Sequence, residues 1–358
     1  MAVARLSTQL ALPALPRAPL FPSTRYQGSK LKLVEWIWEN IQDLGFETAL
    51  DAFGGTGAVS HLLKRQGKTV FYNDVLKFNY LIGLALIENR ATTLSDADVS
   101  RLLETHPHIR FGDFIAQTFT GIFFTDEENR WLDRVIRNIS ALDDKYKQAI
   151  AYFALFQACI AKRPYNLFHR HNLYIRTADV ERTFGNKATW DTPFEEHFRN
   201  FFAEANASVF DNGKNNIALN LDVFDVVGDF DLVYIDPPYV ATSGVGVDYL
   251  DFYHFLEGIA DYEHWAARID HRLKHKGLKH AKPVWCDKDR IHGAFDRLFA
   301  KFRDSILVVS YRSNGIPSVS ELVFLLEKYK KSVTKVESAD YQYVLSRTQS
   351  QEVLLIAE

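Results

Sequence analysis

The chain of 358 residues is long enough for two domains of ordinary size or for one enlarged domain with an insertion. Hydrophobic residues make up 47% of it and charged residues 24%, a composition that supports a sizeable core and excludes a disordered chain. The formal net charge of −3 does not indicate a nucleic-acid-binding protein as a whole, so any basic surface must be local.

Cysteine usage and hydropathy indicate the cellular compartment in which the protein is expected. Cys159 and Cys286 lie far apart and outside any CxxC pair, so the sequence offers neither a disulfide framework nor a cysteine-only zinc site. No run of about 18 apolar residues is present to span a membrane. Prolines interrupt the N-terminal segment too early for a signal peptide. We therefore expect a cytoplasmic protein without a membrane partner.

The chain begins with a proline-rich segment, residues 1–24. Its prolines at 13, 16, 19 and 22 recur with the three-residue period of a polyproline II helix. The period predicts an extended N-terminal arm packed on the domain surface, and the alternative is a ligand for a partner domain.

Helical and strand-like patterns alternate after this arm. Helical spacing of apolar residues occurs at 30–45, 58–67 and 76–90, and strand-forming runs lie between them at 48–53 and 69–75. Strands and helices that alternate at this short spacing predict βαβ units and a parallel sheet.

The alternation stops between about 92 and 214, where the patterns are mainly helical, and it resumes with the strand-rich stretch 216–235. The economical interpretation is a catalytic α/β domain of residues 25–91 and 215–358, interrupted by a helical insertion at 92–214. We expect later helices at 262–273, 289–302 and 318–329 and later strands at 283–286, 305–311, 341–346 and 352–357.

A glycine-rich turn, "LDAFGGTGAVS" at 50–60, joins the first predicted strand to a helix. Its glycines leave room for backbone N–H groups to approach a ligand, but their spacing is not that of the GxGxxG dinucleotide fingerprint. Asp51, at the end of the strand, would repel a pyrophosphate and suits a cationic ammonium group. The alternative is a tight turn that binds nothing.

Asp74 ends the next strand, near the spacing of about 20 residues beyond the glycines at which an acid reaches ribose hydroxyls in nucleotide-binding α/β folds. An acid in this place is also a common helix cap. Together, Asp51 and Asp74 indicate a ligand with a ribose and a free amino acid end, and S-adenosylmethionine is the obvious candidate.

The stretch "VYIDPPYVA" at 233–241 ends a buried strand abruptly. Pro237 and Pro238 have no backbone N–H to donate, so the strand cannot continue beyond Asp236. Asp236 and Tyr239 then lie at the carboxyl edge of the sheet, where open α/β sheets bind ligands. The stretch is therefore either a pocket edge or a stiff turn.

Five segments, taken in chain order, resemble the motif series of the α-class, Dam-like DNA adenine-N6 methyltransferases. They are "RYQGSK" at 25–30, "DAFGGTG" at 51–57, "YNDV" at 72–75, "LDVFDV" at 221–226 and "DPPY" at 236–239. The resemblance runs from about residue 21 to the C-terminus, and "FHRHNLYIR", "GVDYLDFYHFLEGIADYEHW" and "SYRSNGIPS" are similar to segments of restriction-modification members. It implies a Rossmann-like S-adenosylmethionine-dependent methyltransferase sheet of seven mixed strands, with an inserted, mainly helical target-recognition domain.

The resemblance also implies site residues. The catalytic set is Asp236, Pro237, Pro238 and Tyr239, and the cofactor set is Tyr26, Lys30, Asp51, Phe53, Gly54, Gly57, Asp74, Asp222 and Val223. Within the cofactor set, Tyr26 and Lys30 hold the methionine end, Asp74 binds the ribose, and Asp222 accepts from the adenine amino group. A solvated helix start for Lys30 and an N-cap for Asp222 are the structural alternatives. Val223 stands where the family often has an aromatic residue.

This assignment gives the DPPY segment a chemical purpose. Adenine N6 is a poor nucleophile because its lone pair is delocalised into the ring. Fixed acceptors on Asp236 and the Pro237 carbonyl would favour a more tetrahedral nitrogen that attacks the sulfonium methyl in line. Tyr239 would stack on a base flipped from the duplex. This chemistry needs no metal.

A local basic segment, "AKRPYNLFHRHNLYIR" at 161–176, contains no acid and interleaves cations with aromatic rings. Its position in the family predicts DNA contacts to phosphates and base edges. The predicted DNA-binding residues are Lys162, Arg163, Asn166, His169, Arg170, Asn172 and Arg176. A second basic run at 271–282 either contacts phosphates too or is a solvated face.

We therefore expect a site-specific methyltransferase that modifies adenine N6 in double-stranded DNA, as the protective partner of a cognate restriction endonuclease. Two alternatives stay open. An RNA or protein amino-methyltransferase would keep the cofactor residues without a DNA-facing insertion, and a catalytically idle DNA-binding subunit would tolerate loss of Asp236. The recognition sequence and the oligomeric state do not follow from the sequence.

Overall fold

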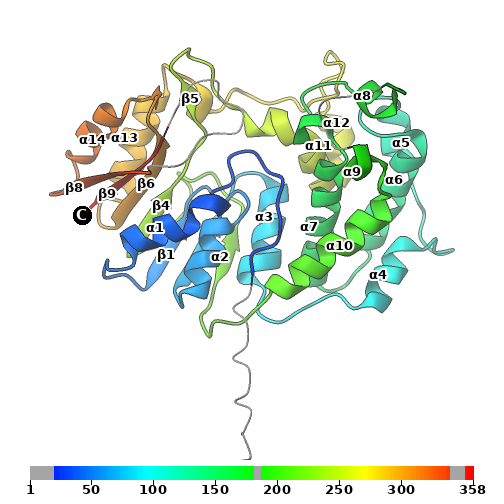
Figure 1. The fold of residues 1–358 in the computed structure, drawn as a ribbon, viewed down its shortest axis with the longest axis horizontal. Coiled ribbons are helices and arrows are strands. Elements are labelled where there is room, and N and C mark those ends of the chain that lie inside the picture. Colours follow the sequence, from blue (N-terminus) through cyan, green and yellow to red (C-terminus); the bar gives the residue numbers. More distant parts are fainter. Residues whose placement is uncertain (1–19, 181–186, 339–350) are drawn as a thin grey trace, which may run out of the picture.

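The computed structural model describes residues 20–180, 187–338 and 351–358. The predicted N-terminal arm up to residue 19 and the predicted strand at 341–346 lie outside these residues. A seven-stranded sheet forms one half of the molecule, and helices α4–α10 form the other (Figure 1). None of the described helices is both long and apolar enough to cross a membrane.

The large sheet has the order β3-β2-β1-β4-β6-β9-β8. Its strands are β1 Thr48–Asp51, β2 Thr69–Asn73, β3 Ile217–Leu219, β4 Leu232–Ile235, β6 Ile306–Arg312, β8 Val333–Glu337 and β9 Glu352–Ala357. Strand β9 runs opposite to the other strands of this sheet and pairs antiparallel with both β6 and β8. The chain moves outward from β1 through β2 to β3 and then crosses to β4 and β6, so the switch point of the topology lies between β1 and β4.

Helices cover both faces of the sheet. Those packed on the sheet are α1 Val34–Ile41, α2 Ala58–Arg65, α3 Lys77–Gly83, α13 Ile291–Lys301 and α14 Val319–Leu326. Helices α11 Tyr249–Ala260 and α12 Trp265–Arg268 follow β4 in the chain but lie in the helical half (Figure 1), where the Trp265 ring contacts those of Phe114 and Phe119. Successive strand residues point to opposite faces. Accordingly, Ala49 and Tyr234 join the core under α1–α3, whereas Leu50 and Val233 join the core under α13 and α14.

The helices between β2 and β3 beyond α3 correspond to the predicted insertion. They are α4 Asp96–Leu103, α5 Phe114–Thr118, α6 Asp126–Ser140, α7 Lys145–Ala161, α8 Tyr174–Thr177, α9 Lys187–Asp191 and α10 Phe194–Ser208. Helix α7 is buried on every side from Ala149 onward, as expected of a central helix. It also packs on α3, where the Phe78 and Phe156 rings lie 5.8 Å apart. The core is therefore continuous across the predicted boundaries at 92 and 214, which remain predictions.

Two expectations about secondary structure were wrong, and one strand was not predicted. Residues 283–286 form a 3₁₀ turn, Val284–Cys286, instead of a strand. The helix expected at 262–273 ends at Arg268, because the chain then turns into a hairpin closed by pairing of Ile269 with Leu278. Strand β8 was not predicted, since its side chains are half exposed or exposed and include charged residues typical of an edge strand.

A small second sheet follows the DPPY segment. It pairs β5 Val240–Ala241 with β7 Gly315–Ile316 in antiparallel orientation. The segment therefore leaves the main sheet at Asp236, as its prolines predict, and continues into a short ribbon above the sheet edge.

Candidate active site

A cavity of about 510 Å³ opens at the carboxyl ends of β1, β2 and β4, at the switch point of the sheet. The structure brings together there most of the residues predicted from separate segments of the sequence. They are Tyr26, Lys30, Asp51, Phe53, Gly54, Asp74, Asp222, Val223, Asp236, Pro237 and Pro238. Two predicted residues, Gly57 and Tyr239, lie behind the cavity wall.

The glycine-rich turn is shaped by its contact with Tyr72. A Cβ atom on Gly54 would lie 2.0 Å from the Tyr72 ring, so no larger residue fits without a shift. Gly57 has a φ of 78° and starts α2, a left-handed conformation that favours glycine. Gly57 therefore sets the path of the turn, and Gly54 forms the wall of the cavity.

Two buried carboxylates stand at the strand ends. Asp51 accepts a hydrogen bond of 2.6 Å from Ser60 on one oxygen, and its other oxygen has no partner among the described residues. Asp74 accepts from the backbone N–H groups of Gly55 and Leu76 at 2.9 and 2.8 Å. Burial raises the pKa of Asp51 to about 7 and that of Asp74 to about 6. A cationic or hydroxyl-bearing ligand would favour their ionised forms.

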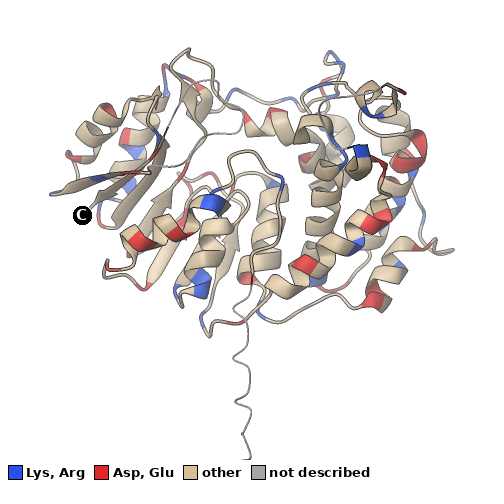
Figure 2. Cartoon of the chain, viewed as in Figure 1, with Lys and Arg blue, Asp and Glu red and all other residues tan. Residues whose placement is uncertain are grey.

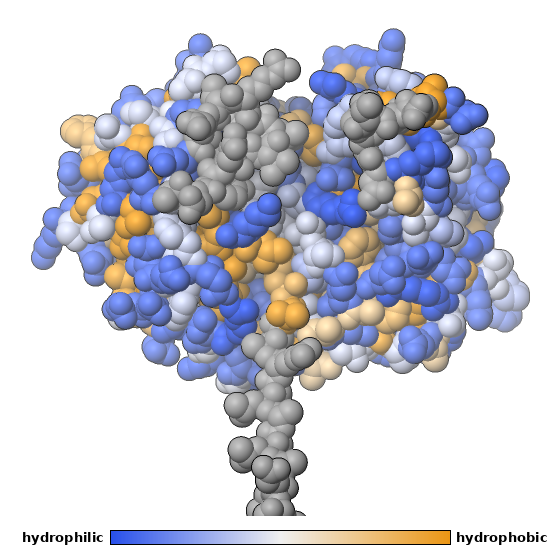
Figure 3. Space-filling model, viewed as in Figure 1, coloured by the Kyte–Doolittle hydropathy of each residue, from blue (hydrophilic) through white to orange (hydrophobic). Residues whose placement is uncertain are grey.

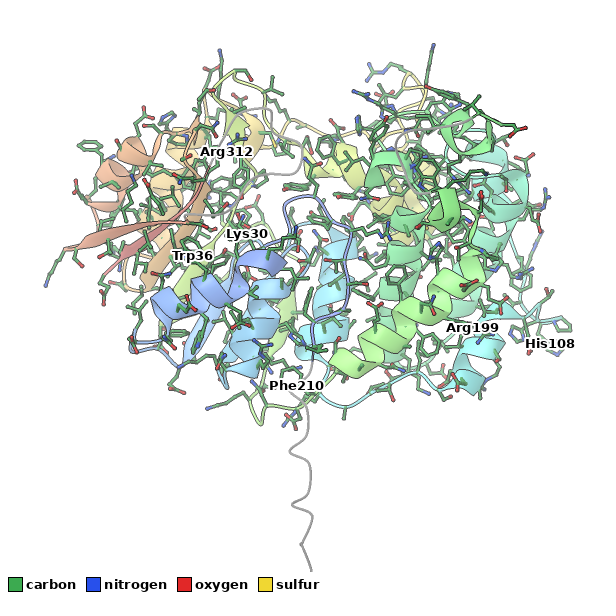
Figure 4. The ribbon with its side chains drawn as sticks, in the orientation of Figure 1. Lys30, Trp36, His108, Arg199, Phe210 and Arg312 are labelled. Carbon is green, nitrogen blue, oxygen red and sulfur yellow. The ribbon has the colours of Figure 1, made fainter. Side chains whose placement is uncertain are left out.

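Asp236 belongs to a buried network that the sequence did not reveal. Lys30 Nζ donates to Asp236 Oδ1 at 2.8 Å and lies 3.3 Å from Glu352 on β9. It also contacts the Tyr239 hydroxyl, which donates to the same Asp236 oxygen at 3.0 Å. Lys30 lies above α1, near the middle of the view in Figure 4. It is 5% exposed, so the alternative of a solvated helix start does not hold for it.

Tyr239 differs from its expected role in this arrangement. Its ring is buried and packs edge-on against Tyr311 at 5.5 Å, away from the cavity. Stacking on a flipped base would require the ring to turn. In the observed conformation its hydroxyl instead fixes the Asp236 carboxylate.

Glu352 is the fourth member of this buried network, with Lys30, Asp236 and Tyr239. It is fully buried and accepts a hydrogen bond from Ser310 on β6. Burial raises the pKa of Asp236, the Lys30 ammonium opposes this shift, and the negative charge of Glu352 adds to it. No sequence pattern marks Glu352, because it lies in an apolar closing strand far from the motifs.

An apolar wall faces the carboxylates. Val223 and Phe53 line it together with Trp285, whose ring lies 5.0 Å from that of Phe53. Phe224 stacks on Trp285 from outside at 5.9 Å. Trp285 thus supplies the aromatic surface that Val223 lacks. Trp285 was not among the predicted site residues, because residues 283–286 were expected to form a strand and instead form a 3₁₀ turn.

A stack of tyrosines forms another part of the cavity wall. The Tyr26 ring lies nearly parallel to those of Tyr249 and Tyr253, at centroid distances of 5.4 and 4.6 Å. Tyr26 and Tyr249 line the cavity. Tyr249 falls within the segment after DPPY that resembles restriction-modification enzymes, which was the available signal for it.

The predicted DNA contacts at 161–176 need correction for four residues. Lys162 and Arg176 are buried and both pair with Glu128, at 2.9 and 2.7 Å. Arg163 is 1% exposed and donates to Asn172 and to the carbonyl of Leu167. Lys162, Arg163 and Arg176 therefore stabilise the insertion and present no charge to DNA, and the buried amide of Asn172 accepts from Arg163 instead of contacting a base.

The remaining three residues of that set are accessible. Arg170 is exposed, and Asn166 and His169 are half-buried.

Among the described residues, Asp248, Asp251 and His280 have the spacing of possible metal ligands. The Asp248 carboxylate, however, raises the pKa of His280 to about 9, which favours an imidazolium ion pair at neutral pH.

The mostly parallel sheet and the carboxylate-lined cavity at its switch point define a Rossmann-like methyltransferase. The sequence matches the D12 class N6 adenine-specific DNA methyltransferases over residues 26–323, and the chain belongs to this family. The family assignment made from the five motifs is thus confirmed.

Several modification methylases are similar to the chain. Type II methyltransferase M2.HphI of Haemophilus parahaemolyticus is 30% identical over 351 residues, which cover 95% of this chain and 98% of that protein. Modification methylase StsI of Streptococcus sanguinis is 25% identical over 91% of this chain. Type II methyltransferase M.FokI of Planomicrobium okeanokoites is 26% identical over 85% of it. The chain spans 50% and 47% of the lengths of these last two proteins.

Proposed function

We propose that the protein transfers a methyl group from S-adenosylmethionine to N6 of an adenine flipped out of duplex DNA, within a restriction-modification system. The observation that carries the proposal is the placement of Asp236. One of its oxygens is held by Lys30 and Tyr239, while the residue lines a cavity that also contains Asp51, Asp74 and Asp222.

The cavity residues fit S-adenosylmethionine. The unpartnered oxygen of Asp51 suits the ammonium of the amino acid end. Asp74 suits the ribose hydroxyls. Asp222 and the wall of Val223, Phe53 and Trp285 suit the adenine. When bound, the cofactor supplies an electrophilic methyl group on a sulfonium.

The catalytic contribution of the chain is positioning and hydrogen-bond acceptance. Asp236 and the Pro237 carbonyl accept from the two N–H groups of the target amine, which directs its lone pair at the methyl. The N–C bond forms as the C–S bond breaks, and the amine then releases one proton. Lys30 and Tyr239 hold the carboxylate in place, so it needs little reorganisation.

Asp222→Ala should weaken cofactor binding by about 1 to 2 kcal/mol, because it removes an acceptor for the adenine amino group. Asp222 is exposed at the cavity rim, so the fold should tolerate the change. Asp225→Ala is the matched control, since Asp225 is exposed on the same turn and does not line the cavity. Calorimetry of S-adenosylmethionine binding measures both. Equal dissociation constants in the two variants would mean that the adenine site lies elsewhere.

Glu352→Gln should shift the acidic limb of the pH profile of kcat toward lower pH. Glu352 adds to the raised pKa of Asp236, so removing its charge lowers that pKa and keeps the carboxylate ionised at lower pH. The groups around Asp236 are Lys30, Asp51, Tyr234, Tyr239 and Glu352. Single-turnover rates between about pH 5 and 8 test the prediction. If the acidic limb of the pH profile does not shift and only the maximal rate falls, Glu352 has a purely structural role.

The substrate class is tested by incubating the full chain with tritiated S-adenosylmethionine and duplex DNA, RNA or protein. We expect label in duplex DNA. Label in RNA or protein alone would favour the amino-methyltransferase alternative. A cognate endonuclease remains part of the proposal, supported by the names of the similar modification methylases.

A further inference from the structure

An exposed basic hairpin, residues 269–282, borders the cavity on the side of the insertion. Its base is closed by pairing of Ile269 with Leu278, and both side chains are buried. Backbone bonds from Asp270 to Gly277 and from Lys279 to Arg268, of 2.7 and 2.8 Å, extend the closure. These bonds hold the base of the hairpin in one conformation, so the hairpin is an ordered element.

The hairpin carries more exposed positive charge than the segment 161–176, in which Arg170 is the exposed cation of the predicted set. Its four lysines are Lys274, Lys276, Lys279 and Lys282. Each is exposed or half-buried, and none of the four ammonium groups forms a hydrogen bond or salt bridge with a described residue. Arg272 differs, because Asp270 neutralises it at 2.6 Å. Figure 2 shows blue on this loop, which rises beside α8 at the top of the view.

The C-terminal arm of the hairpin reaches the cavity. His280, Ala281 and Lys282 line it, and the chain continues into the Trp285 wall. His280 Nε2 lies 2.9 Å from Asp248, which caps the start of α11. This ion pair fastens the hairpin beside the DPPY segment. The outline of the molecule dips at the top between its two halves (Figure 3).

Arg170 extends the same surface. The ring of His275 in the hairpin lies 5.2 Å from that of His254, and His254 Nε2 lies 3.0 Å from the carbonyl of Phe168, two residues before Arg170. Arg170 is the exposed cation that remains from the predicted DNA-binding set. It links the insertion to the hairpin.

We propose that the basic hairpin binds the phosphate backbone of the DNA on either side of the nucleotide that enters the cavity. This inference rests on the proposed function. A base can reach the DPPY segment only by leaving the stack, which keeps its flanking phosphates at the cavity mouth. Flexible ammonium groups suit phosphates and carry no sequence preference, so the hairpin positions DNA and does not read its bases.

The test compares two double variants of the full chain. Lys274→Gln/Lys279→Gln removes two hairpin charges outside the cavity wall. The matched control, Lys301→Gln/Lys331→Gln, removes two exposed charges near α13 and α14. We expect the hairpin variant to raise the Kd for duplex DNA by about one order of magnitude and to reduce the salt slope of log K by about 2. Specific and non-specific duplexes should be affected alike, and the affinity for S-adenosylmethionine should not change.

A Kd and salt slope equal to those of the control variant would overturn the inference. A loss of affinity confined to one DNA sequence would also overturn it, because phosphate contacts do not discriminate sequence. If the unmutated protein binds DNA without salt dependence, the inference fails while the proposed function stands. If it neither binds nor methylates duplex DNA, the proposed function fails, and the inference fails with it. Thermal unfolding of each variant checks that the fold is intact.

Discussion

Asp236→Ala should abolish methyl transfer and leave the affinity for S-adenosylmethionine close to that of the unmutated protein. The carboxylate accepts from the target amine, and we expect its loss to lower kcat by about 100-fold or more, as when a preorganised transition-state contact is removed. Lys30 keeps a charged partner in Glu352, so the buried cation is not left uncompensated. Single-turnover rates and calorimetry measure the two effects separately.

Tyr239→Phe provides the graded comparison. It removes a hydroxyl that donates to the same Asp236 oxygen, while the Lys30 contact remains. We expect a smaller loss of rate than for Asp236→Ala, because the acceptor is still present but less firmly held.

For Asp236→Ala, an equal loss of cofactor affinity and of rate would place Asp236 in the cofactor site and contradict the role assigned to it.

Arg163→Ala should lower the free energy of unfolding by about 3 kcal/mol or more, because it opens a cavity and leaves buried acceptors unsatisfied. The guanidinium lies over the Phe123 ring at 4.5 Å and donates to carbonyls within its own segment. Denaturant titration measures the change.

Arg170→Ala is the matched control within the same segment. Arg170 is exposed, so its loss should change stability by no more than about 0.5 kcal/mol. It should instead weaken DNA binding. A stable Arg163→Ala protein with reduced DNA affinity would restore the original prediction that Arg163 contacts DNA.

The positions of the cofactor residues could be predicted because short-range rules determine them. Prolines must end the strand before Pro237, and parallel strands bring their carboxyl ends to one edge. Asp51, Asp74 and Asp236 meet there as expected. The family motifs then supplied the roles, since position alone does not distinguish a cap from a ligand contact.

The fate of the charges in 161–176 could not be predicted, because burial depends on packing between distant segments. Glu128 lies in α6, well before Lys162 and Arg176 in sequence, and compensates both. Without knowledge of such a partner, an acid-free run of cations has the pattern of a binding surface. For the same reason the sequence did not indicate the role of Glu352. Nor did it determine whether the basic run at 271–282 is exposed.

The most direct test of the proposed activity is the identity of the methylated nucleoside. The full chain is incubated with labelled S-adenosylmethionine and a panel of genomic DNAs unmodified at their recognition sites, and the DNA is digested to nucleosides and analysed by mass spectrometry. We predict that the label appears in N6-methyl-2′-deoxyadenosine and in no other nucleoside. Label in a methylated cytidine, or no label across the whole panel, would contradict the account.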